Sequence, residues 1–349
     1  MKELLSKDVS ALKMKKNSEL AKSTAIVILF IVFVASCGKP NSPSELTIPI
    51  GAVDVSGPIT PLPDHVSVNP AKVVLGQRLF NDTRLSADGS IACVTCHDLR
   101  AAGVDHLPTA RGIKGQVVGR NAPTVFNSAL NFRQMWDGRA VSLEEQAGMP
   151  INNPKEMASS WVHVTAVLKS DPWYSRQFSD IYNAPANAAN ISDALATFER
   201  SLITPNAPFD RFLLGDKSAI SSSALEGWRL FRERGCIACH QGINIGGNMF
   251  QKFGVMGNFF HDRNKDDKLD QGRYNVTHEE RDRHVFKVPS LRNVAKTAPY
   301  FHDGSVNNLH EAVLIMGRYQ LGQDLSTQEV ENIEAFLKSL TGCYQGQCL

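Results

Sequence analysis

Hydrophobic positions recur at helical spacing along this chain and rarely alternate as they would in a half-buried strand. Long loops rich in Gly, Pro and Asn separate the helical stretches. Ser192 and Thr327 are suitable N-caps for two of the predicted helices. The pattern therefore predicts an all-α fold, with helices at 71–80, 143–148, 192–202, 223–232, 309–316 and 327–340.

Two segments of the sequence resemble each other, which indicates an internal duplication. The sequence GQRLF at 76–80 corresponds to GWRLF at 227–231, and PTVFN at 123–127 corresponds to PSLRN at 289–293. The same interval separates each of these prolines from an Asp-Gly pair that begins at Asp137 or Asp303.

The duplication predicts two tandem domains of one fold, residues 61–217 and 218–349. The second segment carries an insertion before Pro289, and its charged part, 262–270, is predicted to be a solvated loop.

The first 36 residues have the character of an export signal. Lysines precede the apolar run 25–35, which is shorter than the ~20 residues of a membrane span. The run ends in VASC, which is similar to a bacterial lipobox, so Cys37 is predicted to carry lipid. Ordinary cleavage nearby, with Cys37 left free, is the alternative. Residues 37–60 are rich in Pro, Ser and Gly and are predicted to be a flexible tether.

These features predict a protein in the periplasm, anchored by lipid to the outer membrane. The charge adds little, because 37 Lys and Arg face 35 Asp and Glu. So small an excess gives no broad positive field for nucleic acid, and membrane contact is expected through the lipid anchor only.

The pentapeptide C-x-x-C-H occurs twice, once in each repeat. With 7 Cys and 10 His in the chain, chance predicts roughly 0.004 copies. The motif is typical of c-type haem attachment, in which two thiols bond to the haem vinyl groups and the histidine ligates the iron. A zinc or redox C-x-x-C site is the alternative, but it leaves the histidines unexplained. The predicted haem-binding residues are Cys93, Cys96, His97, Cys236, Cys239 and His240.

The position opposite the histidine differs between the two predicted haem irons. Met316 follows Asp303 at the interval expected for a distal methionine, and His/Met ligation closes an iron and raises its potential. A core methionine is the alternative. The corresponding residue of the first repeat is Pro150, which offers no ligand atom. The pattern therefore predicts an open first haem beside a closed electron-transfer haem.

Two cysteines remain, Cys343 and Cys348. In an exported protein they can form a disulfide that closes a small C-terminal loop, and two free thiols are the alternative.

The segment 61–342 resembles the bacterial dihaem cytochrome c peroxidase family, including its methylamine-utilisation relatives. The motifs that carry the resemblance are RNAPT at 120–124, WDGR at 136–139, LEEQA at 143–147, NPKEM at 153–157 and the segment 286–304. The resemblance implies two cytochrome c-like domains, each wrapped around a covalently bound haem, the first peroxidatic and the second for electron transfer.

The resemblance also implies roles for single residues within these motifs. Gln146 and Glu156 would act at the peroxide site, and Trp136 would relay electrons between the haems. A calcium ion between the domains would take protein ligands from the positions of Asn121, Thr297 and Pro299.

Peroxide chemistry by itself needs groups of this kind. Cleavage of the O–O bond moves a proton from one oxygen to the other, and Glu156 in a partly desolvated pocket could carry it. Gln146 could orient peroxide or water by hydrogen bonds. The alternative is that Glu156 and Gln146 are ordinary surface residues of a helix, without a role in the reaction.

One loop departs from the family pattern. Many members close the peroxidatic haem at rest with a His in a Gly-His-Gly-like loop, where this chain has RGIKG at 111–115 and therefore Ile113. His106 is the nearest residue that a loop shift could recruit; otherwise it is a polar loop residue. The first haem is therefore predicted to be open at rest, without a requirement for prior reduction.

The sequence thus predicts a peroxidase that reduces hydrogen peroxide to water with electrons from a small periplasmic cytochrome c or cupredoxin. A homodimer is compatible with the resemblance. Two other functions stay open: a dihaem oxidase of a protein or organic substrate through a high-valent state, and a non-catalytic dihaem electron carrier.

Overall fold

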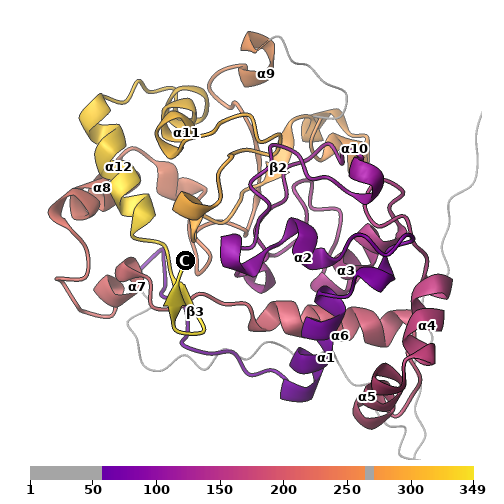
Figure 1. Cartoon of the computed structure of the whole chain (residues 1–349). Helices are drawn as coiled ribbons and strands as arrows, with labels where there is room; N and C mark the ends of the chain where they lie inside the picture. Colours follow the sequence, from indigo (N-terminus) through magenta and orange to yellow (C-terminus); the bar gives the residue numbers. More distant parts are fainter. Residues whose placement is uncertain (1–56, 264–270) are drawn as a thin grey trace, which may run out of the picture. The chain divides into compact units, whose positions relative to one another are not determined.

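Helices make up most of the regular structure in the computed structural model, which describes residues 57–263 and 271–349 (Figure 1). The predicted signal peptide, lipid-bearing Cys37 and most of the tether lie outside the described residues, as does most of the charged stretch 262–270. Within the described ranges, none of the helices is both long enough and apolar enough to cross a bilayer.

The first repeat is organised by helix α1 (Pro70–Phe80) packed on helix α6 (Ala188–Ser201). The Asn69 side chain caps α1 by accepting from the backbone N–H groups of the first turn. Gly76 lets the two helices approach closely, because a Cβ at this position would collide with the Ala194 carbonyl oxygen.

The second repeat is built in the same way, from helix α8 (Ser222–Glu233) packed on helix α12 (Thr327–Lys338). Gly227 takes the place of Gly76, since a Cβ there would collide with the Asn332 carbonyl oxygen. These two glycines explain why the predicted repeat begins with Gly in both copies.

None of the other elements in the described residues is longer than α1. Two antiparallel ribbons, β1 (Phe250–Lys252) with β2 (Val285–Lys287) and β3 (Cys343–Tyr344) with β4 (Gln347–Cys348), accompany the predicted helical structure. The remaining α-helices are α2 (Cys93–Cys96), α3 (Leu143–Asn152), α4 (Trp161–Ser170), α5 (Pro172–Tyr182), α7 (Pro208–Leu213), α9 (Phe259–Asp262), α10 (Tyr274–Thr277) and α11 (Leu309–Ile315). The single-turn 3₁₀ helices are η1 (Thr83–Leu85), η2 (Leu99–Ala101), η3 (Ile113–Gly115), η4 (Ser128–Leu130), η5 (Cys236–Ala238), η7 (Glu280–Asp282) and η8 (Val294–Lys296), and η9 (Met316–Leu321) is a π-helix.

Both predicted N-caps are wrong. Helix α6 starts four residues before Ser192, because Asn187 and Asn190 each accept a hydrogen bond from the other's backbone N–H, and this reciprocal pair fixes an earlier start. Helix α12 is capped by Ser326, whose hydroxyl accepts from the Glu329 backbone N–H, so Thr327 is the first helical residue.

Each repeat has its own hydrophobic core. The first core extends from Leu75 to Leu202 and includes the large side chains of α1, α5 and α6. The second extends from Phe209 to Leu340, with Ile59 added from the segment before the first repeat. Helix α7 packs in the second core, although it lies within the range predicted for the first domain.

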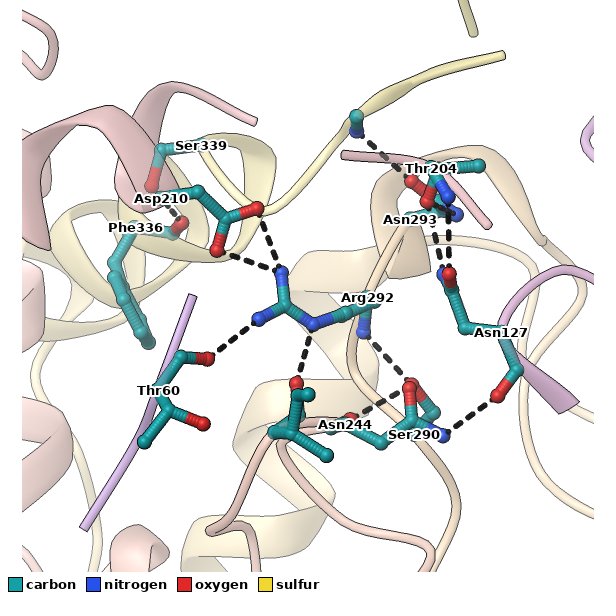
Figure 2. A network of polar contacts seen from close by, with 12 residues as sticks. Thr60, Asn127, Thr204, Asp210, Asn244, Ser290, Arg292, Asn293, Phe336 and Ser339 are labelled. Carbon is teal, nitrogen blue, oxygen red and sulfur yellow. Dashed lines mark hydrogen bonds and ion pairs between the residues drawn. The ribbon is translucent and has the colours of Figure 1, made fainter. Parts of the chain in front are cut away.

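A buried polar network joins the two repeats (Figure 2). Asn127 and Asn293, at corresponding positions, both have left-handed backbone conformations. Each donates through its side-chain Nδ2 to the hydroxyl oxygen of Thr204, at 2.8 and 2.9 Å. Thr204 thus accepts one hydrogen bond from the equivalent asparagine of each repeat.

An ion pair lies beside this network (Figure 2). The Arg292 guanidinium contacts both carboxylate oxygens of Asp210, at 2.9 and 3.0 Å, and both side chains are almost fully buried. Arg292 also donates to the Thr60 carbonyl oxygen at 3.0 Å. Loss of either partner would leave a buried charge unpaired, so the pair ties α7 firmly to the second core.

Candidate haem sites

The first cysteine pair lies on one helical turn, α2, with both thiols free and half-buried. His97 follows directly, and its Nδ1 lies 3.3 Å from the Gly103 carbonyl oxygen. This contact orients the ring and leaves Nε2 as the nitrogen that could bind a metal. Burial lowers the pKa of His97, which keeps the imidazole in the neutral form that ligates iron.

The second cysteine pair repeats this arrangement. Cys236 and Cys239 are free, η5 brings them onto one turn, and Nδ1 of His240 lies 3.4 Å from the Ile245 carbonyl oxygen. Burial lowers the pKa of His240 to about 4. Both sites therefore fit a c-type haem, with two accessible thiols one turn apart and an oriented, neutral histidine.

Met316 lies where α11 ends and the π-helix η9 begins, and it is half-buried. A π-turn inside a helix is costly and is found frequently at functional sites. This setting supports Met316 as a ligand, and the role stays a prediction.

Glu156 lies in the loop after α3, the helix that carries both Gln146 and Pro150. Burial raises the pKa of the Glu156 carboxyl, while a 2.7 Å hydrogen bond from Asn153 Nδ2 opposes the rise. Gln146 is half-buried on the same helix. A desolvated carboxyl with a raised pKa is a candidate general acid–base group.

The loop that contains Ile113 packs directly against Glu156. The Ile113 backbone N–H donates to the Glu156 carbonyl oxygen at 2.7 Å, and the Cys96 thiol lies 3.8 Å from the Arg111 carbonyl oxygen. The Glu156 charge also contributes to the raised pKa of Cys96, after burial and Asp105. The structure thus brings Ile113, Glu156 and the first cysteine pair together.

Trp136 meets the second repeat. Its indole Nε1 donates to the Asn121 carbonyl oxygen at 2.9 Å, and its ring lies edge-on to His302 with the centroids 6.3 Å apart. The Asn121 backbone N–H donates to the His302 carbonyl oxygen at 2.9 Å, and the Lys287 backbone N–H donates to the Trp136 carbonyl oxygen at 2.8 Å.

These two backbone hydrogen bonds are equivalent under the repeat. Trp136 precedes the Asp-Gly pair of the first copy and His302 precedes that of the second. Sequence reasoning missed His302, although the repeat aligns it with Trp136. It also missed Glu199, a buried carboxyl on α6 that adds to the raised pKa of Cys93.

The predicted calcium ligands lie around one loop. The Asn121 amide donates to the Leu107 carbonyl oxygen at 3.0 Å, and His106 Nδ1 lies 2.8 Å from the Ala298 carbonyl oxygen. The loop thus contacts both Asn121 and the segment from Thr297 to Pro299. Among the residues that the structure describes, no group of three or more His, Cys, Asp or Glu could hold a metal. A calcium ion here would depend on amide and carbonyl oxygens, which it accepts.

Cys343 and Cys348 form a disulfide between β3 and β4. Of the two alternatives for the C-terminal cysteines, the structure therefore has the bonded pair.

Comparison with known proteins identifies the family. Residues 70–218 match the sequence model described as Di-haem cytochrome c peroxidase. The chain is 48% identical over 288 residues to the cytochrome c peroxidase Ccp of Escherichia coli K12, and the match covers 82% of this chain and 62% of that protein. It is 44% identical over 293 residues to the cytochrome c551 peroxidase of Nitrosomonas europaea, covering 84% and 86% of the two chains.

A solved structure is similar over nearly its whole length. The crystal structure of a MauG-like protein associated with microbial copper homeostasis matches with a TM-score of 0.73 at 26% identity, over 83% of this chain and 95% of that one. The chain therefore belongs to the di-haem cytochrome c peroxidase family, and this membership implies two haems.

Proposed function

We propose that this protein is a cytochrome c peroxidase, which reduces hydrogen peroxide to two waters with two electrons and two protons. The two similar relatives named as peroxidases support the reaction. The observation that carries the proposal is the cluster at the first haem site, where the half-buried carboxyl of Glu156 lies beside the first cysteine pair and the open position predicted by Pro150 and Ile113.

We further propose two cytochrome c-like domains, residues 61–217 and 218–349, each with one covalently bound haem. The free thiols of each C-x-x-C pair would form the thioether bonds, and His97 and His240 would ligate the irons. When bound, the haems would supply the redox chemistry and the position at which peroxide binds.

The protein's own residues would transfer the protons and the electrons. Glu156 would move a proton between the two peroxide oxygens, and Gln146 would orient peroxide or water by hydrogen bonds. Trp136, in contact with both repeats, would carry electrons from the second site to the first. Met316 would close the second iron to exogenous ligands.

A calcium ion is proposed between the repeats, held by oxygens of Asn121, Thr297 and Pro299. The ion would stiffen the loop that contains His106. The same ion would lie next to Asn121, whose carbonyl oxygen accepts the hydrogen bond from the Trp136 indole. The ion would thus hold Trp136 in place.

The electron donor is proposed to be a small cytochrome c or cupredoxin. We propose that the protein faces the periplasm and is anchored to the outer membrane through lipid on Cys37. A homodimer is proposed as its assembly.

The proposal is tested by peroxide-dependent oxidation of a reduced cytochrome c. Glu156→Gln should retain both haems, yet lose about 10²–10⁴-fold in turnover, because this is the usual contribution of a general acid–base group. Glu331→Gln, an exposed change on α12, is the control for an added amide. Wild-type turnover in Glu156→Gln would remove this residue from the mechanism, and two haems without any turnover in the wild type would indicate an electron carrier.

A further inference from the structure

An aromatic cluster joins Trp136 to Tyr319. Phe259, Phe260 and Phe286 form a small buried core, and both Trp136 and Tyr319 pack against it. Trp136 comes from the first repeat, whereas Tyr319 lies on the π-helix η9. Tryptophan and tyrosine are the two aromatic side chains that are most easily oxidised, and here one packed cluster contacts both.

The rings between them are in close contact. The Tyr319 and Phe259 centroids are 5.3 Å apart, and those of Phe259 and Phe253 are 4.3 Å apart. His302 continues the series, at 6.3 Å from Phe253 and 6.3 Å from Trp136. These centroid separations are those of aromatic rings in direct contact. Electron tunnelling weakens less steeply with distance through packed atoms than through empty space, so these rings offer a route between Tyr319 and Trp136.

Tyr319 also has a place for its proton. Its hydroxyl donates to Asp262 Oδ2 at 3.1 Å, and this carboxylate is 48% exposed. Desolvation and the bond to Asp262 raise the pKa of Tyr319, so the phenol is protonated at neutral pH. Oxidation of a phenol releases its proton, and Asp262 is positioned to accept it.

The tyrosine is accessible from solvent. It lines a surface pocket of about 350 Å³ together with Phe259, Arg263 and Arg318. A small reductant can therefore approach Tyr319, whereas Trp136 lies between the repeats.

We propose that Tyr319 is a redox-active residue, the surface end of a route that supplies electrons to Trp136. This inference rests on the proposed function, because peroxide is the oxidant. When Trp136 has lost one electron and no donor protein is present, Tyr319 gives one electron to Trp136 and its phenolic proton to Asp262. The products are neutral Trp136, a Tyr319 phenoxyl radical and a protonated Asp262.

The test uses the haem-loaded, fully oxidised protein mixed with hydrogen peroxide without donor, frozen within milliseconds and examined by electron paramagnetic resonance. The wild type should show a tyrosyl radical that Tyr319→Phe loses. Asp262→Asn should also reduce the radical yield, because the proton acceptor is gone. Phe253→Leu should reduce it as well, because it breaks the ring contacts with Phe259 and His302.

Tyr182→Phe is the matched control. Tyr182 also donates to a carboxylate, Asp193, at 2.7 Å, but it packs in the first core, away from the phenylalanine cluster. This variant should keep the radical. Peroxide consumption with an unchanged radical in Tyr319→Phe or Phe253→Leu would overturn the route and leave the peroxidase proposal standing. Absence of any peroxide consumption would overturn both.

Discussion

Single side chains are predicted to set the difference between the two haem sites. Met316→His should lower the reduction potential of the second haem and slow turnover, because His/His ligation stabilises ferric iron relative to His/Met ligation. A spectroscopic redox titration measures the change. Met256→Leu is the control, since this methionine of the same repeat is 63% exposed. If Met316→His left the titration unchanged, Met316 would not be the ligand.

The buried Glu199 carboxyl should make the free energy of unfolding depend on pH. Burial raises its pKa from 4.5 to about 8 in the folded protein. Between these values the folded state holds a proton that the unfolded state has released. The free energy of unfolding should therefore fall as pH rises, by about 1.4 kcal/mol per pH unit from this group.

Glu199→Gln should remove that component of the pH dependence. Denaturant unfolding of both proteins at several values between pH 5 and pH 8 measures the difference, with Glu331→Gln as an exposed control. Stability curves that stay parallel for wild type and Glu199→Gln would show that the carboxyl is ionised in the folded protein.

At the level of elements, the two helix pairs depend on close glycine contacts. Gly→Ala inside a helix ordinarily stabilises by about 0.5–1 kcal/mol. Gly227→Ala should instead destabilise by about 1–3 kcal/mol, because its Cβ meets the Asn332 carbonyl oxygen on α12. Thermal unfolding shows the sign, and Ser223→Ala on the exposed side of α8 is the control. A gain of stability in Gly227→Ala would mean that the helices are not in contact at this residue.

The sequence predicted the helices that carry the repeat and missed others for identifiable reasons. Helix α4 (Trp161–Ser170) is rich in valine, which has modest helix propensity. Its cap, Ser160, and the Asp171 cap of α5 (Pro172–Tyr182) were the available signals. The π-helix η9 continues directly from α11, and the sequence pattern gave no signal that separates the two elements.

At the level of the whole molecule, the duplication was readable in sequence, but its geometry was not. Corresponding motifs align Trp136 with His302 and Asn127 with Asn293. A sequence repeat does not predict that equivalent residues of the two copies lie close together in the fold. Thr204, which binds both asparagines, belongs to neither motif. Residues that join two repeats become visible only once both are packed.

The resting state of the first haem is predicted to depend on the loop that contains Ile113. This side chain is 4% exposed, and its backbone donates to the Glu156 carbonyl oxygen. Nδ1 of His106, the other histidine considered for the iron, lies 2.8 Å from the Ala298 carbonyl oxygen. Ile113→His should therefore supply the missing ligand, convert the first iron to low spin and make activity depend on prior one-electron reduction. Activity of this variant without reduction would show that the loop cannot reach the iron.

The most direct measurement is stopped-flow mixing of the fully oxidised, haem-loaded protein with hydrogen peroxide, alongside its resting electron paramagnetic resonance spectrum. With Pro150 and Ile113 unable to bind iron, we expect one high-spin and one low-spin haem and a fast reaction without pre-reduction. A purely low-spin resting spectrum and no fast reaction would contradict an open first site and show that another ligand closes it.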